Sequence, residues 1–217
     1  MDMLSIVTYI AIGTIAMMFP VMLQGSWYAL ERSKLVAATV LLTVSGTLGT
    51  MLLFYIENGD FLGTSFFGAV FFVPVFFVLI ARVLKIRYNI LLDLCAPAEC
   101  AMLAVMKFQC NLIGCCGGIK ISLPKFSFIF PSQIVEMCTA IVLCTVLLTM
   151  SRKLQNRGRI YPWYMVLYGI ARFVLNLFRK TGFVKALHMP FGNFWALISI
   201  VVGVLWLIIV RMKENKK

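Results

Sequence analysis

The chain has 217 residues, of which 62% are hydrophobic and only 13% are charged. An ordinary soluble domain has roughly 45–50% apolar and about 25% charged residues. A water-soluble globule of this size cannot bury so much apolar surface, so the composition indicates an integral membrane protein. The same figures exclude disordered, collagen-like and coiled-coil chains.

The formal net charge is +12, with 20 Lys and Arg residues against eight acids. These basic residues stand in short clusters between apolar runs, whereas nucleic-acid-binding proteins gather them on one face among polar or aromatic residues. We therefore expect no nucleic-acid partner. The seven Cys residues include no Cys-x-x-Cys pair and only one His accompanies them, so we expect no metal site and no cofactor.

Apolar stretches of about 20 residues are long enough to cross the roughly 30 Å hydrocarbon core of a membrane. Seven stretches qualify or nearly qualify, and no linker or repeat divides the chain. We therefore expect one membrane domain covering residues 1–217, folded as an all-α bundle of seven transmembrane helices. The expected spans are about 4–25, 35–56, 61–83, 91–114, 133–150, 161–178 and 193–210.

The loops between these spans predict the orientation of the chain. With the N-terminus outside, the inside loops and the C-terminal tail hold thirteen Lys and Arg residues, and the outside loops hold five. Inside loops of membrane proteins carry the excess of positive charge. The sequence therefore predicts a multi-pass protein of the plasma membrane with the N-terminus outside and the C-terminus inside.

Apart from Arg82 at the inner end of the third span, the charged residues within the spans are Asp93, Glu99, Lys107, Glu136 and Arg172. Each costs about 2.5–3.5 kcal/mol on insertion scales. We expect Asp93 to be solvated close to the inner surface. Counting 1.5 Å per residue from the outer ends of the spans puts Lys107 roughly 10 Å, Arg172 roughly 9 Å and Glu136 about 7–8 Å deep.

These last three charges reach a similar level on three different helices. Two cations with one acid would suit an anionic lipid headgroup, because Arg can grip a phosphate with two N–H groups and Lys adds a point charge. The alternatives are a buried ion network that only fixes helix packing, or long side chains that extend to the outer surface.

Two segments lie at a similar depth to these three charges. One is rich in glycine, and the other carries polar side chains. The fourth span ends in Gly114-Cys115-Cys116-Gly117-Gly118, a run that allows irregular backbone, which at membrane depth occurs only in buried or cavity-lining segments. We expect the two Cys residues to be free thiols. The fifth span opens with Pro131-Ser132-Gln133, which places two polar side chains near Glu136.

At these residues the chain resembles the prolipoprotein diacylglyceryl transferases, bacterial enzymes that lipidate the lipobox cysteine of lipoprotein precursors. The resemblance extends from about Tyr55 to Trp206. It depends on the order of four segments, each weak by itself: Phe61-Leu-Gly-Thr-Ser-Phe-Phe-Gly68, similar to a family segment ending in Ser-Phe-His-Gly-Gly; the signature segment Leu91 to Gly118; Pro131-Ser-Gln-Ile-Val-Glu136; and Tyr168-Gly-Ile-Ala-Arg-Phe173.

The resemblance implies transfer of the diacylglyceryl group of phosphatidylglycerol to a cysteine thiol, with release of glycerol phosphate. The partners it implies are phosphatidylglycerol, the signal peptide of a lipoprotein precursor and the surrounding membrane lipid. It makes Arg172, Glu136 and Lys107 candidate catalytic residues. The candidate substrate-binding residues that it adds are Gln133, Ser132, Ser65, Gly114 and Gly118.

The chain departs from the family pattern at several polar positions. The motif histidine of the family corresponds to Phe67, which cannot accept a proton, and His188 is expected in a solvated loop. The signature asparagine and acid correspond to Cys110 and Cys115, and the acid after the sixth-span arginine corresponds to Asn176.

These departures keep two alternatives to the transferase open. One is a related transferase that acts on another acceptor or lipid. The other is a non-catalytic protein that binds or transports lipid, in which the three charges only hold helices together.

Overall fold

A computed structural model describes residues 3–61, 63–114, 117–123, 126–153, 157–178, 183–184 and 189–214. Cys115, Cys116 and His188, which figured in the sequence expectations, lie outside the described residues. The described chain is helical apart from two short antiparallel hairpins, β1 with β2 and β3 with β4. The elements are α1 (Met3–Trp27), α2 (Arg32–Asn58), α3 (Phe67–Leu84), α4 (Tyr88–Ile113), β1 (Lys120–Leu123), β2 (Phe126–Ile129), α5 (Ser132–Ser151), α6 (Ile160–Asn176), β3 (Phe183–Val184), β4 (Met189–Pro190) and α7 (Phe191–Glu214).

The expected all-α membrane fold is confirmed at the level of helix length and composition. Within the described residues, six helices are long and apolar enough to cross a membrane, and the seventh, α6, is shorter, at 17 residues. The third helix begins at Phe67, so the expectation that it spans residues 61–83 was wrong at its start. Gly63, Thr64 and Ser65 lie in a non-helical connection, where glycine and hydroxyl residues favour turns.

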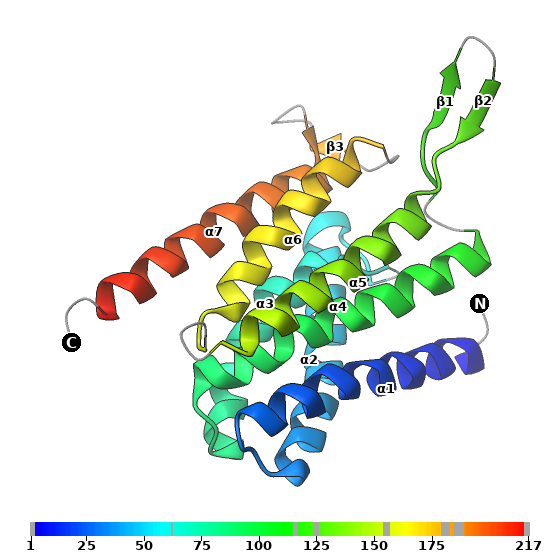
Figure 1. Cartoon of the computed structure of the whole chain (residues 1–217). Helices are drawn as coiled ribbons and strands as arrows, with labels where there is room; N and C mark the ends of the chain where they lie inside the picture. The colour runs from blue at the N-terminus through cyan, green and yellow to red at the C-terminus, as the bar shows by residue number, and fades with distance from the viewer. Residues whose placement is uncertain are drawn as a thin grey trace.

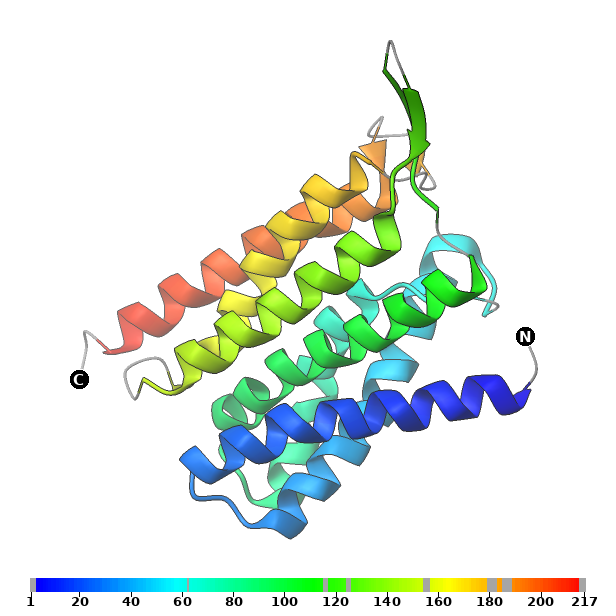
Figure 2. The ribbon, with the colours of Figure 1, turned by 45° about the vertical axis from the view of Figure 1, so that its right-hand side comes forward.

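The helices form two layers (Figure 1). Helices α1, α4, α5, α6 and α7 lie side by side in one row, and α2 and α3 pack together behind it. Figure 2 shows the same row after rotation, with the N-terminus and the C-terminus at opposite ends of the bundle. Large apolar side chains cover the outside of the helices, among them Phe19 and Leu79, each at least 67% exposed. Such a surface suits contact with lipid and not with water.

Helix α4 is the centre of the bundle because it contacts α1, α3, α5 and α6. Small side chains make this possible: Ala96, Ala98 and Cys100 are completely buried, and small residues let helix backbones approach closely in membranes. Helices α2 and α3 touch through Gly49 and Gly68, where a Cβ added to Gly49 would lie 2.7 Å from the carbonyl oxygen of Gly68.

Asp93 is completely buried near the start of α4, so the expectation that it is solvated was wrong. Its carboxylate accepts a 2.9 Å hydrogen bond from the backbone N–H of Ile160 and a short one from that of Gly158, at the beginning of α6. The backbone N–H groups at a helix start have no partner within the helix. A carboxylate from another helix satisfies them here, and the sequence pattern of α4 alone could not show this.

Two further side chains complete this group, which we call the Asp93 cluster: Tyr28, Asp93, Arg157, Gly158 and Ile160. The hydroxyl of Tyr28 donates a 3.4 Å hydrogen bond to Asp93 Oδ2, and the guanidinium of Arg157 lies 4.6 Å from the centre of the Tyr28 ring. Burial, and next the negative charge of Asp93, raise the pKa of Tyr28 above its ordinary value. The cluster thereby joins the end of α1 to α4 and α6.

Candidate active site

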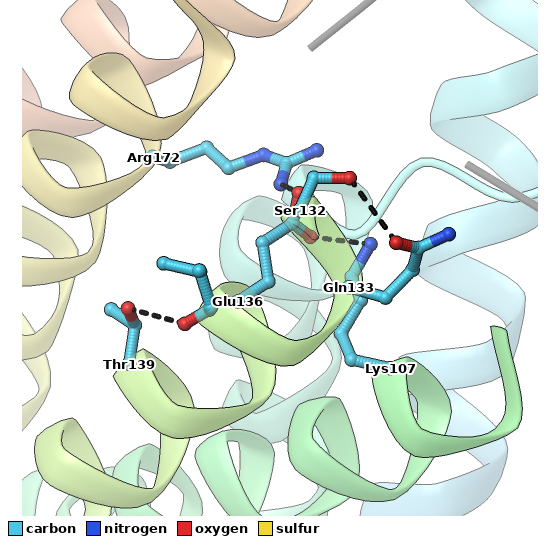
Figure 3. A network of polar contacts seen from close by, with 7 residues as sticks. Lys107, Ser132, Gln133, Glu136, Thr139 and Arg172 are labelled. Atoms are coloured by element: carbon cyan, nitrogen blue, oxygen red, sulfur yellow. Dashed lines mark hydrogen bonds and ion pairs between the residues drawn. The ribbon is translucent and has the colours of Figure 1, made fainter. Parts of the chain in front are cut away.

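A single carboxylate joins two cations that belong to two other helices (Figure 3). Glu136 lies in the second turn of α5, and its side chain is 4% exposed. Lys107 Nζ, on α4, lies 2.6 Å from Glu136 Oε2, and Arg172 Nη1, on α6, lies 2.6 Å from Glu136 Oε1. The three charges that were expected at one level therefore meet, and we call them the Glu136 cluster.

The Glu136 cluster carries more positive than negative charge. Its two cations are not wholly enclosed, since the side chain of Lys107 is 11% exposed and that of Arg172 is 15% exposed. Charges act strongly on one another in such surroundings because little water screens them. An anionic group that reached Lys107 and Arg172 would balance the excess charge without displacing Glu136.

The first turn of α5 places two polar side chains beside these ion pairs. The Oγ of Ser132 lies 3.5 Å from Gln133 Oε1, at the limit of a hydrogen bond, and Figure 3 shows both residues next to Glu136 and Lys107. Pro131 precedes them and has no N–H to leave unpaired at the helix start. The expected neighbourhood of Ser132, Gln133 and Glu136 follows from their spacing on one helix.

Backbone contacts beside Gly118 tie this part of α5 to the end of α6. A Cβ on Gly118 would collide with the carbonyl oxygen of Phe130, which directly precedes Pro131. The N–H of Ile119 donates a 3.1 Å hydrogen bond to the carbonyl of Phe178, and the rings of Phe130 and Phe178 stack with their centres 5.0 Å apart. Gly118, Ile119 and Phe130 form the base of the β1–β2 hairpin, which we call the hairpin base. It therefore holds in place the two helices that carry Glu136 and Arg172.

Comparison with known proteins identifies the family. A family model described as prolipoprotein diacylglyceryl transferase matches residues 3–209. The chain belongs to the prolipoprotein diacylglyceryl transferase family. A phosphatidylglycerol–prolipoprotein diacylglyceryl transferase 2 of Clostridium perfringens is 26% identical over 96% of this chain and 91% of its own length. A phosphatidylglycerol–prolipoprotein diacylglyceryl transferase of Clostridium tetani is 26% identical over 58% of this chain and 55% of its own.

Phe67 stands where the family resemblance placed a histidine. Its ring is buried and packs against Tyr168 and Phe71, with ring centres 5.2 Å and 6.1 Å away. The position is therefore an aromatic part of the core in this family member and cannot exchange a proton with a substrate.

Ser65 and Gly114 lie apart from the Glu136 cluster in their described contacts. Ser65 Oγ donates a 3.0 Å hydrogen bond to Glu57 Oε1, and its N–H donates to the carbonyl of Thr50. Gly114 ends α4 in the left-handed conformation with φ of 75°, which favours glycine. Its expected role in binding substrate stays a prediction, as does that of Ser65.

Asn176 lies one turn after Arg172, where the resemblance expects an acid. The side chain is 2% exposed and packs against Gly192 at the start of α7. Within the described part of the chain, neither Oδ1 nor Nδ2 has a hydrogen-bond partner. An amide therefore fills this place in the core, and it adds no charge near Arg172.

A cavity of about 430 Å³ opens between α1, α2, α4 and the connection before α3. Most of its wall is apolar, for example Met17, Leu42, Phe66 and Met102. Polar residues also border the cavity, among them Thr43, Thr47 and Gln109, and so does the acidic residue Glu99 on α4. The sequence showed that Glu99 interrupts a span but gave no sign that it borders a cavity, because that depends on packing.

The described residues hold no group of three His, Cys, Asp or Glu side chains able to bind a metal ion. The described residues form a site of fixed charges and polar side chains at Glu136, and a separate apolar cavity borders another part of α4. Such a site can bind an anion with an apolar tail and stabilise negative charge that develops on a leaving group.

Proposed function

We propose that this protein transfers the diacylglyceryl group of phosphatidylglycerol to the lipobox cysteine of lipoprotein precursors. The observation that carries the proposal is the Glu136 cluster, in which two cations share one buried carboxylate in a chain of this family. A network that served only packing would need one cation to balance one acid. The additional positive charge suits a phosphate.

The proposed reaction is a displacement at carbon. The sulfur of the acceptor cysteine attacks the glycerol carbon that bears the phosphate, and the carbon–oxygen bond to the phosphate breaks. Glycerol phosphate leaves with the electron pair of that bond, so negative charge develops on its oxygen. Fixed cations beside this oxygen stabilise the transition state more than the substrate, which is what accelerates a reaction.

Each residue of the Glu136 cluster, and each of three residues near it, has a distinct proposed role. Arg172 binds the phosphate through two N–H groups, and Lys107 adds a point charge. Glu136 positions both cations, since one carboxylate oxygen binds Lys107 on α4 and the other binds Arg172 on α6. Ser132 and Gln133 orient the lipid headgroup from the first turn of α5. Gly118 shapes the adjoining backbone.

In this proposal, the apolar parts of both substrates bind in one cavity of the protein. The apolar cavity of about 430 Å³ accepts part of the diacylglyceryl chains and the apolar segment of the precursor's signal peptide. The protein spans the bacterial plasma membrane seven times, with the N-terminus outside, as the excess of basic residues in alternate loops supports. The Glu136 cluster then lies in the outer half of the membrane.

The test is transfer to a peptide by purified full-length protein in phosphatidylglycerol vesicles. A lipobox peptide should gain the mass of a diacylglyceryl group on its cysteine, and glycerol phosphate should appear in equal amount. A Cys→Ser version of the peptide and vesicles of phosphatidylcholine are the controls. Folded protein that modifies no peptide would overturn the proposal.

A second candidate function is transfer to a different acceptor, and Phe67 favours it because the family's histidine is absent there. The same vesicles distinguish the two functions. Release of glycerol phosphate without modification of the peptide would support the second candidate over the first.

A further inference from the structure

A cleft of about 580 Å³ lies between the start of α4 and the residues just before α6, at the end of the bundle that carries the C-terminus (Figure 1). Tyr88, where α4 begins, precedes Lys107 by 19 residues, which corresponds to about 28 Å along a helix. The cleft is therefore far from the Glu136 cluster, and it shares no lining residue with the apolar cavity. It is lined by Arg87, Tyr88, Asn89, Ile90, Arg157 and Gly158.

Two arginines from separate parts of the chain border this cleft. Arg87 is exposed, whereas Arg157 is partly buried and fixed in place. Arg157 Nη2 donates a 2.7 Å hydrogen bond to the carbonyl of Trp27, and the guanidinium lies over the ring of Tyr28. Neither contact neutralises its charge. Within the described residues, no carboxylate forms an ion pair with Arg87 or Arg157.

Asp93 does not offset these two charges by direct contact. Its carboxylate accepts hydrogen bonds from the backbone N–H groups of Gly158 and Ile160, and from the hydroxyl of Tyr28. Its acceptor capacity therefore serves the start of α6, and the positive charge at the cleft stays available to an anion from outside the protein.

The start of α4 adds hydrogen-bond donors to the cleft. No side chain caps this helix, and its first turn contains no acid. The first backbone N–H groups of a helix lack partners within it and carry partial positive charge. Asn89 belongs to this first turn and lies against Gly158, because a Cβ added to Gly158 would be 3.4 Å from the Cβ of Asn89. The helix start and both arginines therefore border the same space.

The number of basic residues at this end has a simpler explanation, but their arrangement does not. Residues 82–92 and 151–160 contain several Lys and Arg residues and no acid, as is typical of the inside loops of a membrane protein. Orientation in the membrane requires only that such residues be present. It does not require a cleft, nor an arginine held by a backbone carbonyl and an aromatic ring at the end of α1.

We propose that this cleft is a binding site for a phosphate group, that of an anionic phospholipid headgroup. The guanidinium groups of Arg87 and Arg157 bind phosphate oxygens, and the side-chain amide of Asn89 donates a further hydrogen bond. Basic pockets between transmembrane helices on the cytoplasmic side bind such headgroups. The volume suits a whole headgroup, since small-molecule sites measure about 300–1,000 Å³. A small phosphate from solution shares this chemistry, and the experiment distinguishes the two sources.

A phosphate bound in the cleft would connect the start of α4 with the start of α6. Asp93 already joins these two helices from inside the bundle, and the phosphate would join them at the surface. A ligand that binds the folded protein and not the unfolded chain stabilises the fold. The bound lipid should therefore raise the heat resistance of the protein. This role is separate from the proposed reaction.

The experiment titrates the full-length protein in detergent with phosphatidic acid and counts bound lipids by native mass spectrometry. Phosphatidylcholine, whose headgroup has no net charge, is the control lipid. Wild-type protein should bind phosphatidic acid about tenfold more tightly than phosphatidylcholine. Arg87→Gln should weaken the binding of phosphatidic acid by about tenfold, as expected for the loss of a hydrogen bond to a charged group. Arg87→Lys keeps the charge and should weaken it less.

Arg82→Gln is the matched control for Arg87→Gln. It removes the same charge from an exposed arginine in the last turn of α3 that does not border the cleft. Its affinity for phosphatidic acid should stay close to that of the wild type. The binding that depends on Arg87 should persist in Arg172→Ala, because Arg172 belongs to the Glu136 cluster at the other end of the bundle.

Competition with inorganic phosphate identifies the source of the phosphate group. Phosphatidic acid that stays bound in millimolar inorganic phosphate would support the lipid, and its displacement from the wild type would overturn the lipid in favour of a phosphate from solution. Equal affinity for the two lipids, or equal losses in Arg87→Gln and Arg82→Gln, would overturn the site itself. Failure to modify a lipobox peptide would overturn the transferase and leave this inference unaffected.

Discussion

The bundle contains two buried charge clusters, and their carboxylates differ in the kind of partner that they have. Asp93 accepts hydrogen bonds from backbone N–H groups that start α6, and these groups cannot move without unwinding the helix. Glu136 instead holds the side chains of Lys107 and Arg172, which have rotatable bonds and carry charge of their own.

This difference indicates which cluster has a structural role and which has a chemical one. The acceptor capacity of Asp93 serves the start of a helix, so its loss exposes unpaired backbone. The cations at Glu136 exceed the acid in number and keep part of their surface exposed. We therefore expect changes at Asp93 to affect folding, and changes at the Glu136 cluster to affect catalysis.

The largest expected effect is on the rate after Arg172→Ala. Loss of a group that stabilises developing negative charge lowers the rate by about 10²–10³-fold. The amount of folded protein should change little, because Lys107 still pairs with Glu136. Arg172→Lys should give an intermediate rate, since it keeps the positive charge but loses the planar guanidinium that binds a phosphate through two N–H groups.

The matched control for this change is Arg157→Ala, which removes an arginine from the Asp93 cluster. Transfer per folded molecule should stay at the wild-type level in this variant. If Arg172→Ala reduces folded protein and activity in parallel, the Glu136 cluster is a packing feature and the comparison fails.

Asp93→Asn should mainly lower stability. The amide NH₂ that replaces one carboxylate oxygen would face a backbone N–H of α6, and a buried donor without a partner costs about 1–3 kcal/mol. The recovery of monodisperse protein after stepwise heating in detergent measures this effect. Unchanged heat resistance, or lost activity in fully folded protein, would contradict the structural role of Asp93.

Gly118→Ala tests whether the hairpin base positions the Glu136 cluster. The added methyl group collides with the backbone of Phe130 and should displace the start of α5. A displacement of about 1 Å at a site can lower a rate by about 10²-fold, so we expect a loss of roughly ten- to a hundredfold. Gly117→Ala is the control, since a methyl group there meets no atom within 4 Å. Equal rates in the two variants would contradict a positioning role.

The smallest expected effect is that of Tyr28→Phe at the Asp93 cluster. Because burial raises the pKa of Tyr28, the folded protein keeps this proton when the unfolded chain loses it, above about pH 10. Wild-type stability should therefore decline above this pH more steeply than that of the variant. Below pH 9 the variant should be less stable by about 0.5 kcal/mol, for one long hydrogen bond. Parallel thermal-unfolding curves across the pH range would contradict a buried Tyr28.

Much of the fold follows from the apolar pattern, because a helix that crosses lipid must be about 20 residues long and almost uniformly apolar. The prediction was wrong at the start of α3, where Gly63 to Ser65 carry no charge that would end a span but favour turns. It was also wrong for Asp93, since distance from a helix end does not show which neighbouring helix covers a side chain.

The common depth of Lys107, Glu136 and Arg172 was predictable for a simple reason. Residue number along a helix converts to distance at 1.5 Å per residue, so counting from the helix ends gives the level of each charge. Counting does not give the direction in which each side chain points. The shared contact with Glu136 therefore required the packing of α4, α5 and α6.

The sequence by itself determined the membrane class, the helices and the family motifs, because these depend on composition and on neighbours along the chain. Only the tertiary structure decided that both cations meet one carboxylate, that Asp93 caps α6, and that Glu99 borders a cavity. The physical reason is that contacts between helices depend on their rotation and spacing, which residues distant in the sequence set together.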